Sequence, residues 1–149
     1  MCFIIVNEFN NVKLNSNFEK FSEQSNEQFN IDIDDWEWIP VQVFLRRTKS
    51  YSDIDFSGVY IIKNLDTEKV YVGQSVNVIK RLRQHLNGSS SVGNVDINDS
   101  IVNGDHLIVY GLRFSDYDFS DLNDMERYFI DYFDAYAFGY NRTKGNKSL

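Results

Sequence analysis

Short runs of β-branched and aromatic residues alternate with polar turn segments in the second half of the chain. Two such runs, Gly58–Lys63 and Lys69–Val72, are separated by the polar segment 64–68. Such runs favour strands and a short polar connection favours a reversal, so the pattern predicts a β-hairpin. A third run, Leu107–Phe114, has the same character and predicts a further strand of the same sheet.

Apolar residues recur at helical spacing after the hairpin. Val78, Leu82 and Leu86 lie four residues apart and form one stripe. We therefore expect a helix that begins at Ser75, with Ser75 as its N-cap and Gly88 as the stop signal beyond its end.

Two more helices are predicted toward the C-terminus. A shorter one covers Val95–Val102, and a longer amphipathic one covers Asp121–Tyr136. Ser120 or Asp121 can cap the longer helix, because short polar side chains accept hydrogen bonds from the first free amides.

The predicted elements indicate an α+β fold with a small central antiparallel three-stranded sheet flanked by helices. Residues 57–149 would form this domain, and residues 1–56 an N-terminal extension with extra strands that serves specificity, dimerisation or regulation. The extra strands are expected at Cys2–Val6 and at Trp36–Leu45. Pro40 would confine the second of these to a sheet edge or a bulge.

Composition supports one folded domain. The chain has 149 residues, 42% hydrophobic and 15% aromatic, enough for one hydrophobic core. Cys2 is its single cysteine, which excludes an internal disulfide and a cysteine-based zinc cluster with only His85 and His106. The apolar run at Cys2–Val6 is too short for a signal peptide or a membrane span, so we expect a cytoplasmic protein.

The net charge of −7 is unusual for a protein that binds nucleic acid. Residues 1–56 carry 5 Lys/Arg against 10 Asp/Glu, a net −5, whereas residues 57–149 carry 10 against 12, a net −2. Much of the acidic excess lies between Glu19 and Glu37. This segment is either a solvated acidic face or one that masks a DNA groove or binds a basic partner.

Basic and polar residues recur along one face of the first predicted helix. Asn77, Arg81 and His85 are spaced at i, i+4 and i+8, so Arg81 and His85 can reach one ligand together. A guanidinium suits a phosphate and an imidazole can transfer a proton. An ordinary solvated helix face, to which Lys80 and Arg83 would also belong, is the alternative.

A carboxylate and two tyrosines are further candidates for the site. Glu126 borders the apolar stripe of the last helix, where a cation or hydrogen bonds must offset its desolvation; a glutamate at the rim of the stripe is the alternative. Tyr60 and Tyr71 lie on the two hairpin strands and can project from one sheet face, although strand tyrosines often serve only packing.

In chain order these residues resemble the motif set of the GIY-YIG nuclease superfamily, over about residues 57–145. Ten residues separate the two motif tyrosines. The matching pieces are Gly58-Val59-Tyr60, Tyr71-Val72-Gly73, Arg81, His85, Glu126 and Gly139-Tyr140-Asn141.

The resemblance implies a role for each residue. Glu126 would be the single protein carboxylate on one Mg²⁺ or Mn²⁺ ion per active site. Tyr60 would be the leading candidate to accept the proton of the attacking water, although either tyrosine can be the base. A free phenol has a pKa of about 10, so positive charge from Arg81 and the metal would be needed. Arg81 would also stabilise charge on the scissile phosphate.

Other positions would support the reaction. His85 would hydrogen-bond or relay protons, Tyr71 would orient the phosphate, and Asn141 would hold substrate or water. Gly58 and Gly73 would allow close backbone approach beside the tyrosines. The remaining candidate substrate contacts are Asn77, Lys80, Arg83, Arg46, Arg47 and Lys49.

These inferences indicate a metal-dependent DNA endonuclease, either restriction-like or structure-specific and phage-type. The alternative is a non-cleaving module on the same fold that binds nucleic acid or another protein. One active site cuts one strand, so cleavage of both strands requires a homodimer on the substrate or sequential nicking. We expect DNA as the partner and no membrane association.

Overall fold

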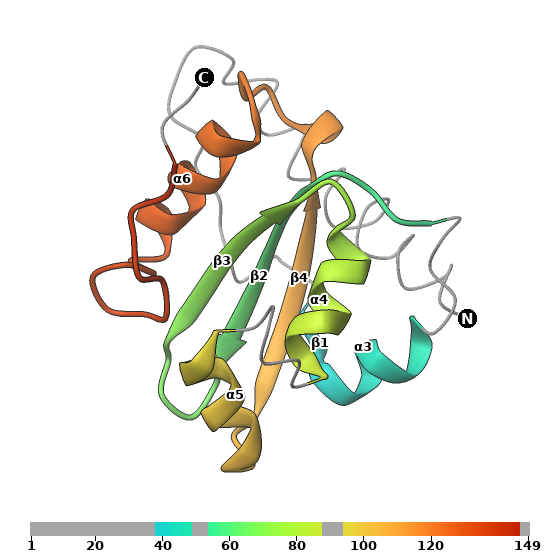
Figure 1. Cartoon of the computed structure of the whole chain (residues 1–149), viewed down its shortest axis with the longest axis vertical. Helices are drawn as coiled ribbons and strands as arrows, with labels where there is room; N and C mark the ends of the chain where they lie inside the picture. The colour runs from blue at the N-terminus through green and yellow to red at the C-terminus, as the bar shows by residue number, and fades with distance from the viewer. Residues whose placement is uncertain (1–37, 49–53, 88–93, 147–149) are drawn as a thin grey trace.

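A computed structural model of the chain shows the hairpin and its surrounding helices (Figure 1). The structure describes residues 38–48, 54–87 and 94–146. The strand expected at Cys2–Val6, the acidic segment 19–37, Lys49 and Gly88 lie outside the described residues.

The predicted hairpin is confirmed. Strands β2 (Gly58–Asn64) and β3 (Val70–Ser75) pair in antiparallel fashion, and β4 (Leu107–Arg113) pairs antiparallel with the other side of β2. A short strand, β1 (Ile39–Pro40), is added next to β4. The strand order is therefore β1-β4-β2-β3, and the sheet has four strands instead of the expected three.

The strand expected over Trp36–Leu45 is confirmed only at Ile39–Pro40 and is wrong for Trp38 and from Val41 onward. Residues 36 and 37 lie outside the described residues. The chain turns at Pro40 into helix α3 (Val41–Arg47), in which Val41 and Phe44 are buried. Proline fixes its own φ near the helical value and needs no amide partner at a helix start, so it favours this turn as readily as a sheet edge. The spacing of the buried residues is helical, and α3 packs on β1 and β4.

The first helix after the hairpin starts later than expected. Helix α4 covers Val78–Leu86, and Ser75 is not its cap. The Asp55 carboxylate lies at this helix end instead, where it accepts hydrogen bonds from the amides of Ile79 (2.7 Å) and Lys80 (3.1 Å). A residue 24 positions away in sequence thus satisfies the free amides of α4.

The other two helices agree closely with the sequence pattern. Helix α5 covers Val95–Val102 as predicted, and α6 covers Leu122–Tyr132 with Asp121 as its N-cap. Helix α6 ends before the expected Tyr136, since Asp134 adopts a left-handed φ of 52° that terminates the helical path. A single 3₁₀ turn, η3 (Phe114–Asp116), follows β4.

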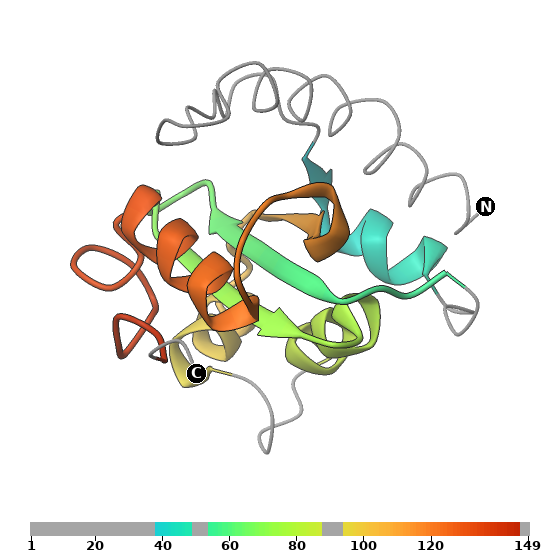
Figure 2. The same cartoon turned by 90° about the horizontal axis from the view of Figure 1, so that it is seen from above.

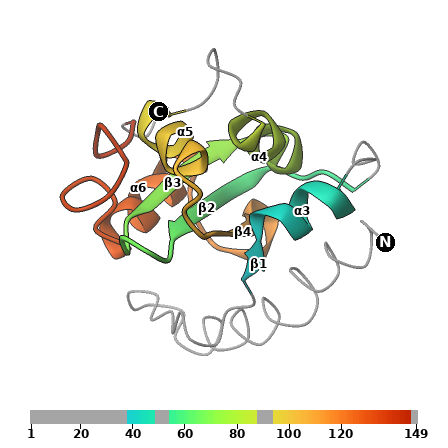
Figure 3. The ribbon, with the colours of Figure 1, turned by 90° about the horizontal axis from the view of Figure 1, so that it is seen from below.

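The helices lie around the sheet in a way that leaves the outer edge of β3 beside α6. Figure 2 shows α4 and α5 on one face of the sheet and α6 along its β3 side, and Figure 3 shows β1 and α3 at the β4 side. Ile39 and Phe44 belong to the same buried core as Ile61 and Phe129. None of the helices in the described part of the chain has the length and apolar character needed to cross a membrane.

Candidate active site

The two motif tyrosines share one face of the sheet, as their spacing predicts. Tyr60 lies opposite Gly73 and Tyr71 lies opposite Ile62, so both phenols project from the face that α4 covers. Their ring centroids are 6.1 Å apart. A Cβ on Gly73 would lie 2.4 Å from the Tyr60 ring, so glycine is required where this ring crosses β3.

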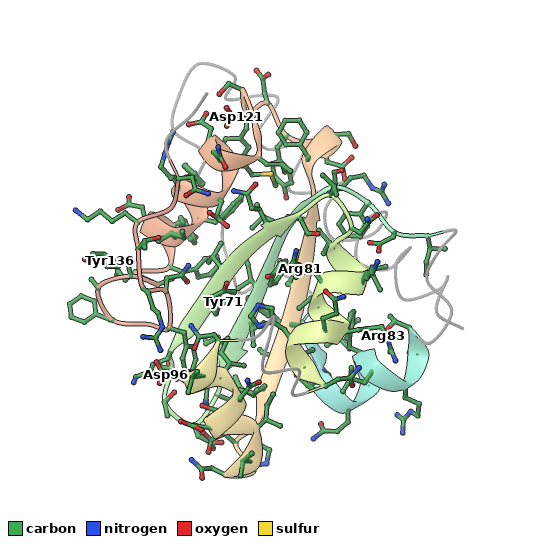
Figure 4. The ribbon with its side chains drawn as sticks, viewed as in Figure 1. Tyr71, Arg81, Arg83, Asp96, Asp121 and Tyr136 are labelled. Carbon is green, nitrogen blue, oxygen red and sulfur yellow. The ribbon has the colours of Figure 1, made fainter. Side chains whose placement is uncertain are left out.

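Helix α4 places His85 against both tyrosines. The His85 ring centroid lies 5.6 Å from that of Tyr60 and 5.0 Å from that of Tyr71. Tyr60 and His85 are each only 2% exposed, whereas Tyr71 is partly exposed. Arg81, one turn earlier on α4, is exposed and lies near enough to influence the ionisation of all three rings (Figure 4).

The two phenols have different electrostatic environments. Burial and then the charge of Tyr71 raise the pKa of Tyr60 well above its ordinary value; a side-chain hydrogen bond with Tyr71 and the charge of Glu126 add to this, and Arg81 acts against it. The pKa of Tyr71 is also raised, by burial and then by the charge of Glu126, while its hydrogen bond with Tyr60 and the charge of Arg81 act in the opposite direction. The same hydrogen bond thus favours the neutral form of Tyr60 and the ionised form of Tyr71.

The His85 imidazole is neutral at neutral pH. Burial and then the nearby Arg81 charge lower its pKa from 6.5 to about 4. Its Nδ1 atom is buried and has no hydrogen-bond partner among the described residues. A neutral ring between two phenols can accept or donate one proton, but it adds no positive charge to the site.

Glu126 lies on α6, across from the end of β3. Its partly buried carboxylate accepts hydrogen bonds from the backbone and the side chain of Gln74, and burial raises its pKa. The Gln74 side chain also donates to Asn123 at 2.7 Å, one turn before Glu126 on the same helix. Gln74 therefore fixes the carboxylate relative to β3 through contacts to two residues of α6.

Residues of the C-terminal third of the chain form hydrogen bonds with the backbone groups on the outer edge of β3. The Tyr140 amide donates to the Val70 carbonyl at 3.0 Å. The Asn141 carboxamide makes two 2.9 Å hydrogen bonds with Val72, one to its amide and one to its carbonyl. Gln74, two residues further along the strand, meets Glu126. Val70, Val72 and Gln74, every second residue of this edge, thus each form a hydrogen bond, and the edge is not left unpaired.

A cleft of about 590 Å³ opens beside this edge. Tyr71 and Val72 of β3, Glu126 and Ile130 of α6, the start of α5 and most of the segment 141–146 line it. Tyr71 and Glu126 therefore face the same space, whereas Tyr60 lies behind Tyr71 and does not line the cleft.

The environment of Glu126 suits a divalent cation. Burial disfavours its charged form. The groups that act against this effect are the two hydrogen-bond donors of Gln74, and neither of them carries a positive charge. Across the residues that the structure describes, no group of three or more His, Cys, Asp or Glu side chains gathers to hold a metal. An ion here would have one protein carboxylate and keep its other positions for water and substrate, as Mg²⁺ commonly does.

The candidate substrate contacts on α4 and just before it lie in two places. Asn77, Lys80 and Arg81 border one small hollow of about 180 Å³ at the start of α4. Arg83 points the other way, toward α3, where it donates to the Leu45 carbonyl at 2.7 Å and to the Thr48 hydroxyl at 3.2 Å (Figure 4). The structure therefore gives Arg83 a structural contact with the end of α3, and its expected phosphate contact stays a prediction.

The two arginines of α3 are not brought to the cleft. Arg46 and Arg47 are exposed in the last turn of α3, which lies beyond α4 as seen from α6 (Figure 1). They can contact DNA only at a distance from Glu126, and the structure leaves their expected role as a prediction.

Sequence reasoning missed two residues that organise the site. Gln74 follows the Tyr-Val-Gly motif directly, and its place on the outward-facing side of an edge strand was a usable signal. Asp55 holds the start of α4, the helix that carries Arg81 and His85, but nothing in its sequence surroundings indicates this contact.

Comparison with known proteins agrees with this arrangement. A family model described as the GIY-YIG catalytic domain matches residues 56–141, more than half of the 149-residue chain. No curated protein and no solved structure matches the chain. The matched segment includes Tyr60, Tyr71, Arg81, His85 and Glu126.

The depressed pKa of His85 predicts a specific pH dependence of stability. The folded state holds this imidazole neutral down to a pKa of about 4, whereas the unfolded chain protonates it at 6.5. The contribution is therefore fully present above pH 6.5 and is lost as pH falls toward 4, by about 3 kcal/mol in total. The difference in unfolding free energy between wild type and His85→Gln should shrink by this order over that range in urea titrations.

Groups that titrate equally in both proteins cancel in this difference, including Glu126. A difference that stays constant between pH 7 and 4.5 would show that His85 is not buried as a neutral ring. An NMR titration of the His85 ring in the wild type gives a second measurement that needs no folded variant.

Proposed function

Because the chain belongs to the GIY-YIG catalytic domain family, we propose that it is a metal-dependent endonuclease that hydrolyses phosphodiester bonds in DNA. The observation that carries the proposal is the convergence of Tyr71 and Glu126 on one cleft, with Arg81 beside Tyr71. A general base for the attacking water, a metal ligand and a phosphate-binding cation are the groups that this hydrolysis requires.

Glu126 is the proposed ligand of one Mg²⁺ or Mn²⁺ ion. When bound, the ion supplies Lewis acidity toward a phosphate oxygen and positive charge near the attacking water. Gln74 holds the carboxylate in place by two hydrogen bonds, and the partial burial of Glu126 strengthens its attraction to a cation.

Arg81 is the proposed contact to the scissile phosphate. It is exposed at the mouth of the hollow that it shares with Asn77 and Lys80, and its charge acts on Tyr60, Tyr71 and His85. A guanidinium can bind two phosphate oxygens at once and stabilise the charge that accumulates there during attack. Asn77 and Lys80 would extend this contact to the neighbouring phosphate.

The two tyrosines have different proposed roles, one as the base in the cleft and the other as a buried supporting residue. Tyr71 lines the cleft, and its hydrogen bond with Tyr60 and the charge of Arg81 favour its ionised form; burial and the charge of Glu126 oppose this, and a cation bound at Glu126 would offset that charge. Tyr60 is almost fully buried, and the same hydrogen bond favours its neutral form, so Tyr60 keeps its own proton. We therefore assign proton acceptance to Tyr71 and the stabilisation of its phenolate to Tyr60, reversing the expectation drawn from the motif order.

His85 and Asn141 are proposed as positioning residues. The neutral His85 ring packs against both phenols and holds their relative orientation. The Asn141 carboxamide forms one hydrogen bond with Val72 at each end and so fixes the cleft wall. Its second N–H and second oxygen lone pair would hold substrate or water, as expected from the sequence.

Substitution of the carboxylate tests the proposed function. With Mg²⁺ or Mn²⁺, the wild type should cleave plasmid or branched DNA, and Glu126→Gln and Arg81→Ala should each lower the rate by at least about 100-fold. Removal of the metal with EDTA should abolish cleavage. The measurement is initial rate by gel, at protein concentrations where circular dichroism shows each variant folded.

Asp131→Ala is the matched control for Glu126. Asp131 is an exposed carboxylate on the same helix and does not line the cleft, so its loss should leave the rate within about twofold. Wild-type protein that binds DNA but cleaves no substrate with either metal would instead favour the alternative, a non-cleaving binding module.

The two tyrosines can be separated by their phenylalanine variants. Tyr71→Phe removes the proposed base and should lower the rate by about 10²- to 10⁴-fold, the usual contribution of such a group. Tyr60→Phe removes only a donor to the phenolate, so activity should persist, with the rising limb of its pH–rate profile moved to higher pH. The reverse ranking, with Tyr60→Phe the more damaging, would return the role of base to Tyr60.

A further inference from the structure

Two aromatic side chains project into solvent from the loop that follows α6, here called the aromatic loop (residues 134–139). Phe138 is 77% exposed and Tyr136 is 45% exposed. Figure 4 shows Tyr136 at the outer margin of the molecule, on the α6 side of the sheet. Nothing in the folded core accounts for two exposed rings in one short loop.

The aromatic loop is held firmly at both ends. Asp134 takes a left-handed conformation with φ 52°, and the amide of the buried Ala135 donates to the Ile130 carbonyl at 2.9 Å. The Phe138 amide donates to the Asp134 carbonyl at 2.9 Å. At Gly139 a Cβ would lie 2.4 Å from the Val70 carbonyl oxygen, so the backbone is packed directly against β3. The fold therefore fixes the backbone of the loop that carries the exposed rings.

The charge of this region differs in sign from that of the remaining chain. Residues 134–149 contain 3 Lys/Arg and 1 Asp/Glu, a net +2, whereas residues 1–133 contain 12 against 21, a net −9. Lys144 lies over the Tyr136 ring with its Nζ 5.9 Å from the centroid. Aromatic rings beside positive charge suit unpaired bases and their phosphates, because every base can stack and every linkage is anionic.

The aromatic loop also lies close to the cleft. Thr143 and Gly145 line the cleft on either side of Lys144, and Lys144 borders a hollow of about 310 Å³ together with Tyr136. Phe138 is three residues from Asn141, which lines the cleft, and three residues span at most about 11 Å. A DNA strand whose phosphate lies at Glu126 can therefore reach the aromatic rings within a few nucleotides.

We propose that the aromatic loop binds unpaired bases of DNA next to the cleavage site, with Phe138 as the principal stacking residue and Tyr136 and Lys144 beside it. This inference rests on the proposed function, because it places the strand in the cleft by means of the Glu126 site. It names the substrate class as DNA with a single-stranded arm, in preference to fully paired duplex.

Equilibrium binding tests this proposal without any cleavage. Fluorescence anisotropy in EDTA would compare a duplex carrying a single-stranded flap with a blunt duplex of the same length. The wild type should prefer the flap DNA, and Phe138→Ala should weaken flap binding by about tenfold, within the range measured for one stacked base, while leaving duplex binding within about twofold. A 2-aminopurine base in the flap should be quenched by wild type and less by Phe138→Ala.

Three further variants separate stacking from other effects. Phe138→Tyr retains an aromatic face and should bind like wild type, whereas Phe138→Leu retains apolar character and should bind like the alanine variant. Val102→Ala removes an 85% exposed apolar side chain of α5 and should change nothing.

Equal affinity of wild type and Phe138→Ala for flap DNA would overturn the proposal. So would a change from dimer to monomer in Phe138→Ala with unchanged DNA binding, since the rings would then serve a second copy of the chain. These results are independent of catalysis. If the protein cleaves DNA but binds it equally well without Phe138, only the stacking role is refuted. If the protein does not cleave DNA but needs Phe138 to bind it, only the nuclease function is refuted.

Discussion

The unpaired outer edge of β3 is the constraint on which the rest of the site depends. An edge strand presents amides and carbonyls that must find partners, and here they are met in succession by Tyr140, Asn141 and Glu126. The same contacts hold the C-terminal third of the chain against the sheet. They bring a carboxylate from α6 to the strand that carries Tyr71, and they leave a cleft between the two elements. Closure of the sheet edge and assembly of the candidate site are thus one structural event.

Burial sets the chemistry of the groups behind this edge. The Tyr60, Tyr71 and His85 rings pack together at centroid distances of 5.0–6.1 Å, in surroundings that favour neutral forms. The pKa of His85 falls and the pKa values of both phenols rise, each mainly through loss of hydration. Arg81 therefore supplies the positive charge that this cluster lacks, and a bound cation at Glu126 would supply more.

Local signals allowed much of this structure to be predicted from sequence, and tertiary contacts explain the remainder. The hairpin, α5 and the start of α6 follow from strand-forming runs, helical spacing and the Asp121 cap, all within a few residues. The two tyrosines share a face because strand geometry fixes it. Pro40 lies in an edge strand as expected, but the strand ends there because proline also suits a helix start, and packing against the core decides how far the strand runs. Asp55 and Arg83 find their partners across the fold, so no local pattern reveals them. Gln74 also meets its partner across the fold, although its place directly after the Tyr-Val-Gly motif was a usable signal.

Metal binding by the isolated protein tests the central claim most directly, because it examines the Glu126 carboxylate apart from any substrate. Mn²⁺ can be titrated into the full chain and the free ion followed by electron paramagnetic resonance, with wild type and Glu126→Gln compared under the same conditions. We expect one bound ion per wild-type chain and an affinity for Mn²⁺ at least about tenfold weaker in the variant. Loss of a residue that only hydrogen-bonds to a metal ligand typically weakens metal binding by about 10- to 100-fold, and loss of the ligand itself should matter no less. Equal binding by the two proteins would contradict the central claim.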